Sequence, residues 1–385
     1  MPELKARAIA FYLPQYHPIP ENDSWWGKGF TEWTNVTKAK ALFKGHYQPR
    51  LPADLGFYDL RVPEVRAEQA KMAAEHGIEG FCYWHYWFGN GKKILERPIT
   101  EVIESGQPDF PFCLAWANET WSGIWHGNPN RILIEQTYTG KEDYTAYFNY
   151  LLRAFRDKRY ILVEGKPLFC INAPQQIPDI KFFTDLFRKL AVKNGLKGLY
   201  IVANTALEDW NPLEHGCDAV NLVLIGNLYR GLPPTRNIVY RKFKNQFIKR
   251  AWLTMLYRKL WKRPVQIYNY KDAIPFLTSE KAFSYDSYPC VIPNWDNSAR
   301  SGINALILHN STPELFEKHL TEAVNLVRNR PIDKKLIFIK SWNEWAEGNH
   351  LEPDRVYGSG YLNIVKKVLS GDDTCGNKSV LLHML

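Results

Sequence analysis

Residues 64–88 read EVRAEQAKMAAEHGIEGFCYWHYWF, and the architecture can be predicted outward from them. Residues 64–76 favour a helix with an acidic first turn, and Gly77 lies just beyond its expected end. Residues 78–88 form a nearly continuous apolar run, which is typical of a strand in a parallel sheet buried on both faces. The stretch therefore predicts one helix–strand unit of an α/β fold.

The same alternation recurs along the chain. Strands are expected at 7–16, 78–88, 111–118, 167–172, 199–204, 219–224, 289–295 and 336–345, and helices at 64–76, 98–105, 142–157, 180–194, 313–328 and 360–369. Eight strands alternating with helices predict an α/β fold, a (β/α)8 TIM barrel with long βα-loop insertions. Two doubly wound domains divided near residue 200 are the alternative.

The extra length is expected in the connections between strands and helices. We predict a single domain over residues 1–385, with the largest insertion, 225–288, in the loop after the sixth strand. Smaller insertions are expected at 17–63 and 119–141.

Composition sets the class of protein. The chain has 385 residues, of which 45% are hydrophobic and 23% are charged, as expected of a globular and not a disordered protein. No apolar run is long enough to span a bilayer, and residues 1–17 lack the apolar region of a secretory signal. None of the six cysteines has CxxC spacing. A reducing, cytoplasmic location without disulfides is therefore predicted.

The net charge of +9 is concentrated in one segment. Residues 229–263 contain eleven Lys and Arg and no Asp or Glu, so the rest is near neutral and a nucleic-acid partner is not expected. Within this segment, residues 241–263 repeat apolar side chains every four residues, which predicts a basic amphipathic helix. Packing on the barrel with a solvated basic face is one interpretation. Peripheral contact with anionic lipid of the inner membrane is the other.

Tryptophan is concentrated near the predicted carboxyl ends of the strands, where barrel enzymes carry their active sites. Indole faces interleaved with polar groups suit stacking on sugar rings, whereas packing of loops onto the barrel is the alternative for each ring. The residues concerned are Trp25, Trp26, Trp33, Trp84, Trp87, Trp116, Trp121, Trp125, Trp295, Trp342 and Trp345.

The most informative segment is 340–354, KSWNEWAEGNHLEPD. It places Glu344 and Glu347 where the eighth strand becomes loop, flanked by Trp342, Trp345 and Gly348. Cleavage of a glycosidic bond usually needs two carboxyl groups, one as acid and one as base or nucleophile. Apolar neighbours and mutual repulsion raise the pKa of one of them. The alternative is that these carboxyls, like that of Glu352, are loop residues that cap a helix.

Five motifs carry a resemblance to a known family: AFYLPQYHPIPEND followed by WWGKGFTEWTNV, then GHYQPRLPADLGFYDLR, GIEGFCYWHYWF, PFCLAWANETW and SWNEWAEGNHLEPD. Over residues 7 to about 368 the chain resembles the WbsX family, whose members are linked to O-antigen lipopolysaccharide and other surface polysaccharide loci. It is also similar to glycoside hydrolase family 99, which comprises retaining endo-α-mannosidases and mannanases on a (β/α)8 barrel.

The resemblance implies roles for particular residues. Residues 343–348 match the NEWxEG motif, so Glu344 would act as base toward the sugar's own 2-hydroxyl and Glu347 as acid, through a 1,2-anhydro intermediate. The expected substrate is a bacterial surface polysaccharide, mannose-configured in the family 99 enzymes. The expected substrate-binding residues are Tyr12, His85, Tyr86, Trp116, Asn118, Glu119, Trp295, Asp296, Trp342, Asn343 and Trp345.

Two other functions compete with a hydrolase. Many WbsX proteins are described as glycosyltransferases, and Glu344 and Glu352 fit the E-x7-E spacing of some transferases, but the chain has no DxD and no phosphate-binding glycine loop. A non-catalytic glycan-binding barrel is the third interpretation. No metal or cofactor is predicted, since the histidines show no HExxH or other ligand spacing, and no GxSxG elbow is present.

Overall fold

The computed structural model describes residues 5–123, 128–234, 260 and 264–370. Its centre is a closed barrel of eight parallel strands, in which β1 pairs with both β2 and β14 and so joins the ends of the sheet. The strands are β1 (Arg7–Tyr12), β2 (Ile78–Trp87), β4 (Phe112–Trp116), β8 (Lys166–Ile171), β9 (Tyr200–Thr205), β10 (Ala219–Leu222), β12 (Asp286–Val291) and β14 (Leu336–Ile339).

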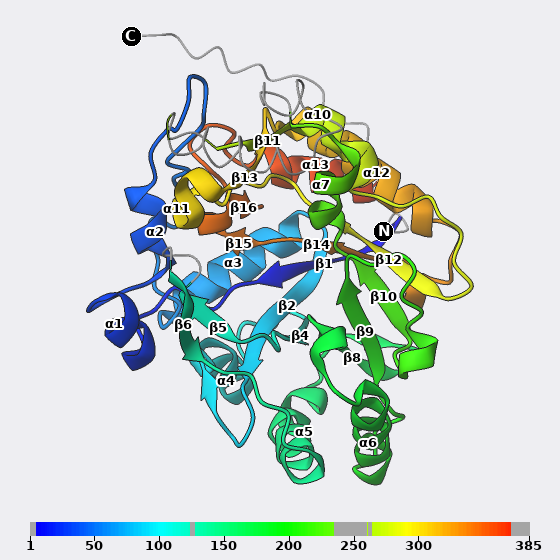
Figure 1. Ribbon diagram of the computed structural model, residues 1–385. Helices are drawn as coiled ribbons and strands as arrows, with labels where there is room; N and C mark the ends of the chain where they lie inside the picture. The colour runs from blue at the N-terminus through cyan, green and yellow to red at the C-terminus, as the bar shows by residue number, and fades with distance from the viewer. Residues whose placement is uncertain (1–4, 124–127, 235–259, 261–263, 371–385) are drawn as a thin grey trace.

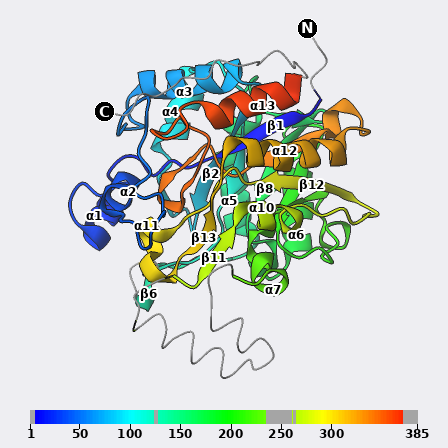
Figure 2. The ribbon, with the colours of Figure 1, turned by 90° about the horizontal axis from the view of Figure 1, so that it is seen from above.

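Long helices surround the barrel (Figures 1 and 2). They are α3 (Pro63–Glu75), α4 (Arg97–Ser105), α5 (Lys141–Phe155), α6 (Ile180–Lys193), α12 (Pro313–Val327) and α13 (Gly360–Ser370). Proline in the first turn of α3, α4 and α12 fits the missing backbone donors at a helix start. The predicted TIM barrel is confirmed, with all eight strands and all six helices near their expected positions.

The barrel differs from the regular alternation of strands and helices at one connection, and from the predicted strand lengths. Between β9 and β10 the chain makes only a short 3-10 turn, Leu213–His215, in place of a helix. Except for β9, the strands also end earlier than their apolar runs. The eighth run was expected to continue to 345, but β14 ends at Ile339 because the chain there turns into a loop built from buried residues.

Shorter elements lie in the connections, most of them directly after a barrel strand and β7 between α5 and β8. They are α1 (Pro20–Trp26), α2 (Glu32–Lys38), β3 (Lys93–Ile94), β5 (Trp121–Gly123), β6 (Asn128–Ile134), β7 (Leu162–Val163), α7 (Leu228–Gly231), β11 (Gln266–Asn269), α10 (Tyr270–Ala273), α11 (Ser298–Ser301), β13 (Leu306–His309), β15 (Asn343–Glu344) and β16 (Asn349–His350). Figures 1 and 2 both show α1, α2, α11 and β6 gathered on one side of the barrel.

The connection after β10 is the largest, and it carries α7, β11 and α10. β11 pairs in parallel with β13, and Leu228, Tyr268 and Tyr270 belong to a second small core there. The expected basic helix 241–263 lies outside the described residues, except for Leu260. Among the described helices, none combines the length and apolar character that crossing a membrane requires.

An aromatic layer fills the barrel interior. Phe11 stacks on Trp84 at 4.6 Å between ring centroids and on Phe338 at 5.6 Å, and Phe338 lies 6.2 Å from Tyr288. These rings come from four strands and are all buried. Large flat side chains give such a layer most of its contact area, and Trp84 also faces the cavity described below.

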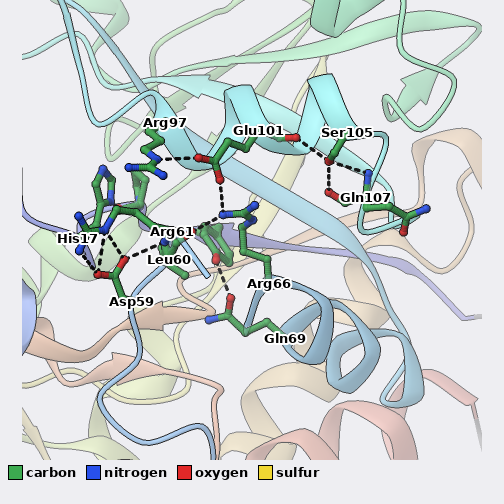
Figure 3. Close-up of polar contacts among 12 residues, drawn as sticks. His17, Asp59, Leu60, Arg61, Arg66, Gln69, Arg97, Glu101, Ser105 and Gln107 are labelled. Atoms are coloured by element: carbon green, nitrogen blue, oxygen red, sulfur yellow. Dashed lines mark hydrogen bonds and ion pairs between the residues drawn. The ribbon is translucent and has the colours of Figure 1, made fainter. Parts of the chain in front are cut away.

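Ion pairs fix the connection between β1 and α3, which carries α1 and α2 (Figure 3). The buried Arg66 donates to the carbonyl of Leu60 and pairs with Glu101 at 2.9 Å, and Arg97 pairs with the same carboxylate at 2.6 Å. Because Arg66 is only 4% exposed, solvent screens this bridge less than a surface pair. The loop is therefore tied to both α3 and α4.

Candidate active site

The segment after β14 makes a tight reversal that presents two carboxyl groups. β15 runs antiparallel to β16, and the 3-10 turn Trp345–Glu347 joins them. Gly348 closes the turn with φ of 54°, and a Cβ there would come within 2.9 Å of Asp296. Only glycine meets both conditions. Glu344 therefore ends the first strand of the reversal and Glu347 ends its turn.

Both carboxyls line a cavity of about 430 Å³ at the side of the barrel where α1, α2 and α11 gather. The charged part of its wall consists of Glu32, Glu119, Arg300, Lys340, Glu344 and Glu347. The remaining wall is aromatic, aliphatic or neutral and polar: Leu13, Gln15, Trp26, Phe30, Asn35, Trp84, Tyr86, Ala117, Thr120, Trp121, Ser122, Leu133 and Asn172. Such a mixture of flat apolar faces and polar groups suits a carbohydrate.

Glu344 is held as a carboxylate. Its Oε1 accepts a hydrogen bond from Trp84 Nε1 at 2.8 Å, and its Oε2 lies 3.3 Å from Lys340 Nζ. Burial alone would raise the pKa of Glu344, but the Lys340 ammonium, hydrogen bonding with Glu347 and the Arg300 charge outweigh burial and lower it. Lys340 itself lies over the rings of Trp84 and Trp295, at 5.3 and 5.6 Å from their centroids.

Glu347 is in the opposite state. Its Oε1 accepts from Arg300 Nη1 at 2.7 Å, whereas no described group donates a hydrogen bond to its buried Oε2. Burial and the charge of Glu344 raise the pKa of Glu347 above its ordinary value, and Arg300 offsets this only in part. Two interacting carboxyls whose pKa values are pushed apart are typical of an acid–base pair.

Four of the predicted catalytic and substrate-binding residues line the cavity, namely Glu344, Glu347, Tyr86 and Glu119, and three of the eleven tryptophans join them: Trp26, Trp84 and Trp121. The Tyr86 ring packs edge-on against Trp121 at 5.2 Å. Glu119 accepts from Asn172 Nδ2 at 2.7 Å at the exposed rim. These four residues come from β2, the loop after β4 and the loop after β14, so the barrel brings distant segments together.

His85 and Trp116 face the helix layer and do not line the cavity. The His85 ring stacks on Tyr147 and Tyr150 of α5, and Trp116 packs against Tyr147 and against Phe183 of α6. Burial lowers the pKa of His85 to about 3, so its ring is neutral. Side chains alternate along a strand, so Tyr86 and His85 necessarily point to opposite faces of β2.

Tyr12, Asn343 and Trp345 belong to a second, fully packed cluster centred on Glu352, and Trp342 is buried beside it. Glu352 accepts from Tyr58 at 2.8 Å, Gln69 at 2.6 Å and Trp345 Nε1 at 2.6 Å. Tyr12 donates to Gln69, Asn343 binds both backbone groups of Leu13, and Trp342 packs on Phe81 at 5.0 Å. Glu352 therefore does not join Glu344 in the cavity.

The other predicted contacts hold loops. The side chain of Asn118 binds both backbone groups of Ala173, and Asp296 accepts from His46 Nε2 at 2.6 Å. Trp295 lies against Lys340 but is not part of the cavity wall. Among the described residues, no three His, Cys, Asp or Glu side chains are grouped so that they could hold a metal ion.

Sequence reasoning missed Glu32, Arg300 and Lys340 as site residues. Arg300 pairs with Glu32 at 3.0 Å and with Glu347 at 2.7 Å, so it joins α2 and α11 to the turn Trp345–Glu347. Glu32 and Lys340 do lie in the quoted motifs FTEWTNV and KSWNEWAEG. For Arg300, only its position shortly after the seventh strand could have indicated a site residue.

The chain is also similar to solved structures. One is the GH99 endo-α-mannosidase from Bacteroides thetaiotaomicron in complex with BIS-TRIS-propane, at 15% identity and a TM-score of 0.57 over 95% of this chain and 96% of that one. Another is a glycoside hydrolase-like protein, at 17% identity and a TM-score of 0.56 over 95% and 94% of the two chains. At this identity the likeness shows a shared fold.

Sequence comparison identifies the family. Two proteins from Xanthomonas campestris pv. campestris, strains B100 and ATCC 33913, each named uncharacterized protein WxcX, are 37% and 38% identical over 373 and 377 residues. These matches cover 96% of this chain and 50% of each relative, so the chain spans about half the length of these proteins. Residues 8–365 match the family described as glycosyltransferase WbsX, and the chain therefore belongs to the WbsX family.

Proposed function

We propose that this chain is a retaining glycoside hydrolase that cleaves a bacterial surface polysaccharide, with Glu344 as base and Glu347 as acid. The observation that carries the proposal is the pair itself. One carboxyl is held as an anion by Lys340 and Trp84, and its neighbour has an oxygen without a donor among the described residues. Both face a cavity large enough for sugar rings.

The proposed reaction has two steps. Glu344 takes the proton of the sugar 2-hydroxyl, whose oxygen attacks C1 while the bond from C1 to the leaving oxygen breaks. Glu347 gives its proton to that oxygen. Glu347 then takes a proton from water, which opens the 1,2-anhydro ring at C1, and Glu344 returns its proton to O2. The 2-hydroxyl and the scissile bond sit on adjacent carbons, which fits two interacting carboxyls.

The likeness to a GH99 endo-α-mannosidase supports a mannose-configured sugar, and membership of the WbsX family supports a polysaccharide precursor as the substrate. In that setting the enzyme would work in the cytoplasm, at times close to the inner membrane. Contact of residues 241–263 with anionic lipid remains a proposal that liposome flotation would test: binding indifferent to anionic lipid and to salt would remove it.

A glycosyltransferase is the second candidate, and the family description favours it. The charges of the cavity favour hydrolysis. A nucleotide-diphosphate donor needs uncompensated positive charge or backbone N–H groups. Here Lys340 pairs with Glu344 at 3.3 Å, and Arg300 pairs with both Glu32 and Glu347.

The test incubates the protein with the polysaccharide repeat unit of its host in water enriched in oxygen-18, and reads the products by mass spectrometry. A hydrolase cuts the glycan and places one heavy oxygen on the new reducing end. A transferase instead lengthens or rearranges glycans without that label. The Glu347→Gln variant should bind the glycan and release product about 10²–10⁴-fold more slowly. Label-free products, or a Glu347→Gln variant as active as the wild type, would contradict the proposal.

A further inference from the structure

Glu32 is placed in the cavity by rigid local structure. It is the first residue of α2, and its backbone N–H donates to the carbonyl of Gln15 at 3.1 Å. Thr31 caps the helix in a reciprocal capping box with Thr34. The Glu32 side chain is 2% exposed, so its carboxyl is fixed beside the catalytic turn.

Arg300 divides its guanidinium between two carboxyls. Its Nε and Nη2 reach Glu32 Oε2 at 3.2 and 3.0 Å, while its Nη1 reaches Glu347 Oε1 at 2.7 Å. The fork geometry of guanidinium allows such sharing by one side chain. Glu32 thus takes two of the donors that could otherwise turn toward Glu347.

The charges around the pair explain where a proton stays. Three buried carboxyls, Glu32, Glu344 and Glu347, face two cations, Lys340 and Arg300. Neutrality in a buried site therefore requires one carboxyl to keep its proton. Asn35 also bonds to Glu32, and Trp84 donates to Glu344, whereas Oε2 of Glu347 has no donor among the described residues.

Among the described residues, the other titratable groups that interact with these carboxyls include two phenols and the thiol of Cys290, and all three are uncharged near neutral pH because burial raises their pKa. Tyr16 packs near Glu32, and Tyr86 lies near all three carboxyls. Burial raises the pKa of both phenols well above its ordinary value. Lys340 and Arg300 are therefore the charges that decide the balance.

We propose that Glu32 is a positioning residue that holds Arg300 by two nitrogens and so leaves the cavity's shared proton on Glu347. The inference rests on the proposed function in one respect, because that function gives the proton its use as the catalytic acid. The position of the proton itself can be measured without any substrate.

The experiment is a pH titration of the protonated carboxyl bands by difference infrared spectroscopy, with Glu347→Gln identifying the Glu347 signal. In the Glu32→Gln variant Arg300 loses the carboxylate that holds its Nε and Nη2. The pKa of Glu347 should fall by about one unit or more, which is a tenfold change in its proton affinity. An unchanged or higher pKa would overturn the proposal.

A second variant changes the same ion pair in the opposite sense. Arg300→Gln removes the cation, so the pKa of Glu347 should rise, whereas simple loosening of the site would move both variants in the same direction. If Glu32→Gln fails to fold, the absence of a rise in Arg300→Gln overturns the proposal by itself. Glu119→Gln is the matched control, since Glu119 lines the cavity but bonds to Asn172, and it should not shift the Glu347 titration.

The experiments can contradict the hydrolase proposal and the positioning role of Glu32 independently of each other. Expected titration shifts without glycan cleavage would remove the hydrolase and keep the role of Glu32. Cleavage by the wild type with no shift in Glu32→Gln would keep the hydrolase and remove that role.

Discussion

Glu347 and Glu352 lie five residues apart in one segment, are both buried, and both have a raised pKa, yet their surroundings differ. Burial raises the pKa of Glu352 to about 7, opposed by hydrogen bonds from Trp345, Gln69 and Tyr58. All of its neighbours are protein groups in a closed cluster. Glu347 has an oxygen without a donor and faces a cavity.

The difference teaches how to separate a reactive acid from a structural one. A raised pKa marks both carboxyls, so it does not distinguish them. A complete set of donors favours a fixed structural role, because each buried partner depends on the others. An unsatisfied oxygen beside open space leaves a place for a substrate atom.

The largest expected effect is on turnover, which should fall much further in a Glu347 variant than in a Glu352 variant. Glu347→Gln should lower turnover by about 10²–10⁴-fold, because an amide cannot donate the proton to the leaving oxygen. Glu352→Gln should change turnover by only a few fold. Steady-state cleavage of the host polysaccharide, with glycan binding measured by calorimetry, checks both. Equal losses in the two variants would erase the distinction.

For stability the order should be opposite: Glu352→Gln should be destabilised and Glu347→Gln should not. Glu352→Gln replaces an acceptor with an N–H that faces Gln69 Nε2, and it should lower the free energy of unfolding by about 1–3 kcal/mol. Glu347→Gln removes the repulsion from Glu344 and should not lower the free energy of unfolding. Urea unfolding at pH 7 measures both. A less stable Glu347→Gln protein would show that its carboxyl is structural.

The pH dependence sharpens the comparison further. A raised native pKa means that the folded state binds more protons than the unfolded state above the ordinary value of 4.5, so stability falls as pH rises through that window. For Glu352 the window extends from 4.5 to about 7. The slope of unfolding free energy against pH should flatten there in Glu352→Gln. An unchanged slope would mean that Glu352 does not titrate in that window.

The pH dependence of the cleavage rate should depend on Glu344 and Glu347. The proposed reaction needs ionised Glu344 and protonated Glu347. It should therefore persist below pH 4.5, where Glu344 stays charged, and fall on the alkaline side as Glu347 loses its proton. A pH profile of kcat measures both limbs. An acid limb at or above 4.5 would contradict the assigned states.

The smallest expected effect compares two tryptophans. Trp121→Ala removes an aromatic face of the cavity and should raise KM about 2–10-fold with little change in kcat. Trp116 packs between the sheet and the helices. Trp116→Leu should therefore leave KM unchanged and lower the free energy of unfolding. If Trp116→Leu raised KM while Trp121→Ala did not, the cavity would be assigned to the wrong face.

The sequence predicted the barrel because strands buried on both faces have an apolar pattern that is independent of distant contacts. It predicted the position of Glu344 and Glu347 because a strand end fixes where a site can form. The alternation of side chains along a strand shows that Tyr86 and His85 cannot both face the cavity. Both were nevertheless expected to contact substrate, because the prediction did not use this alternation. The sequence could not predict that Arg300 reaches Glu32 and Glu347, since that contact depends on how three loops fold over the barrel.

The central claim is that Glu344 and Glu347 act on one sugar in two successive displacements at C1. Directly interacting carboxyls leave no room for the water that single-step inversion places between acid and base, at separations of about 6.5–9.5 Å. The most direct measurement is the anomeric configuration of the first-formed product, read by proton NMR before mutarotation. The account predicts that the configuration of the cleaved bond is retained, and an inverted product would contradict it.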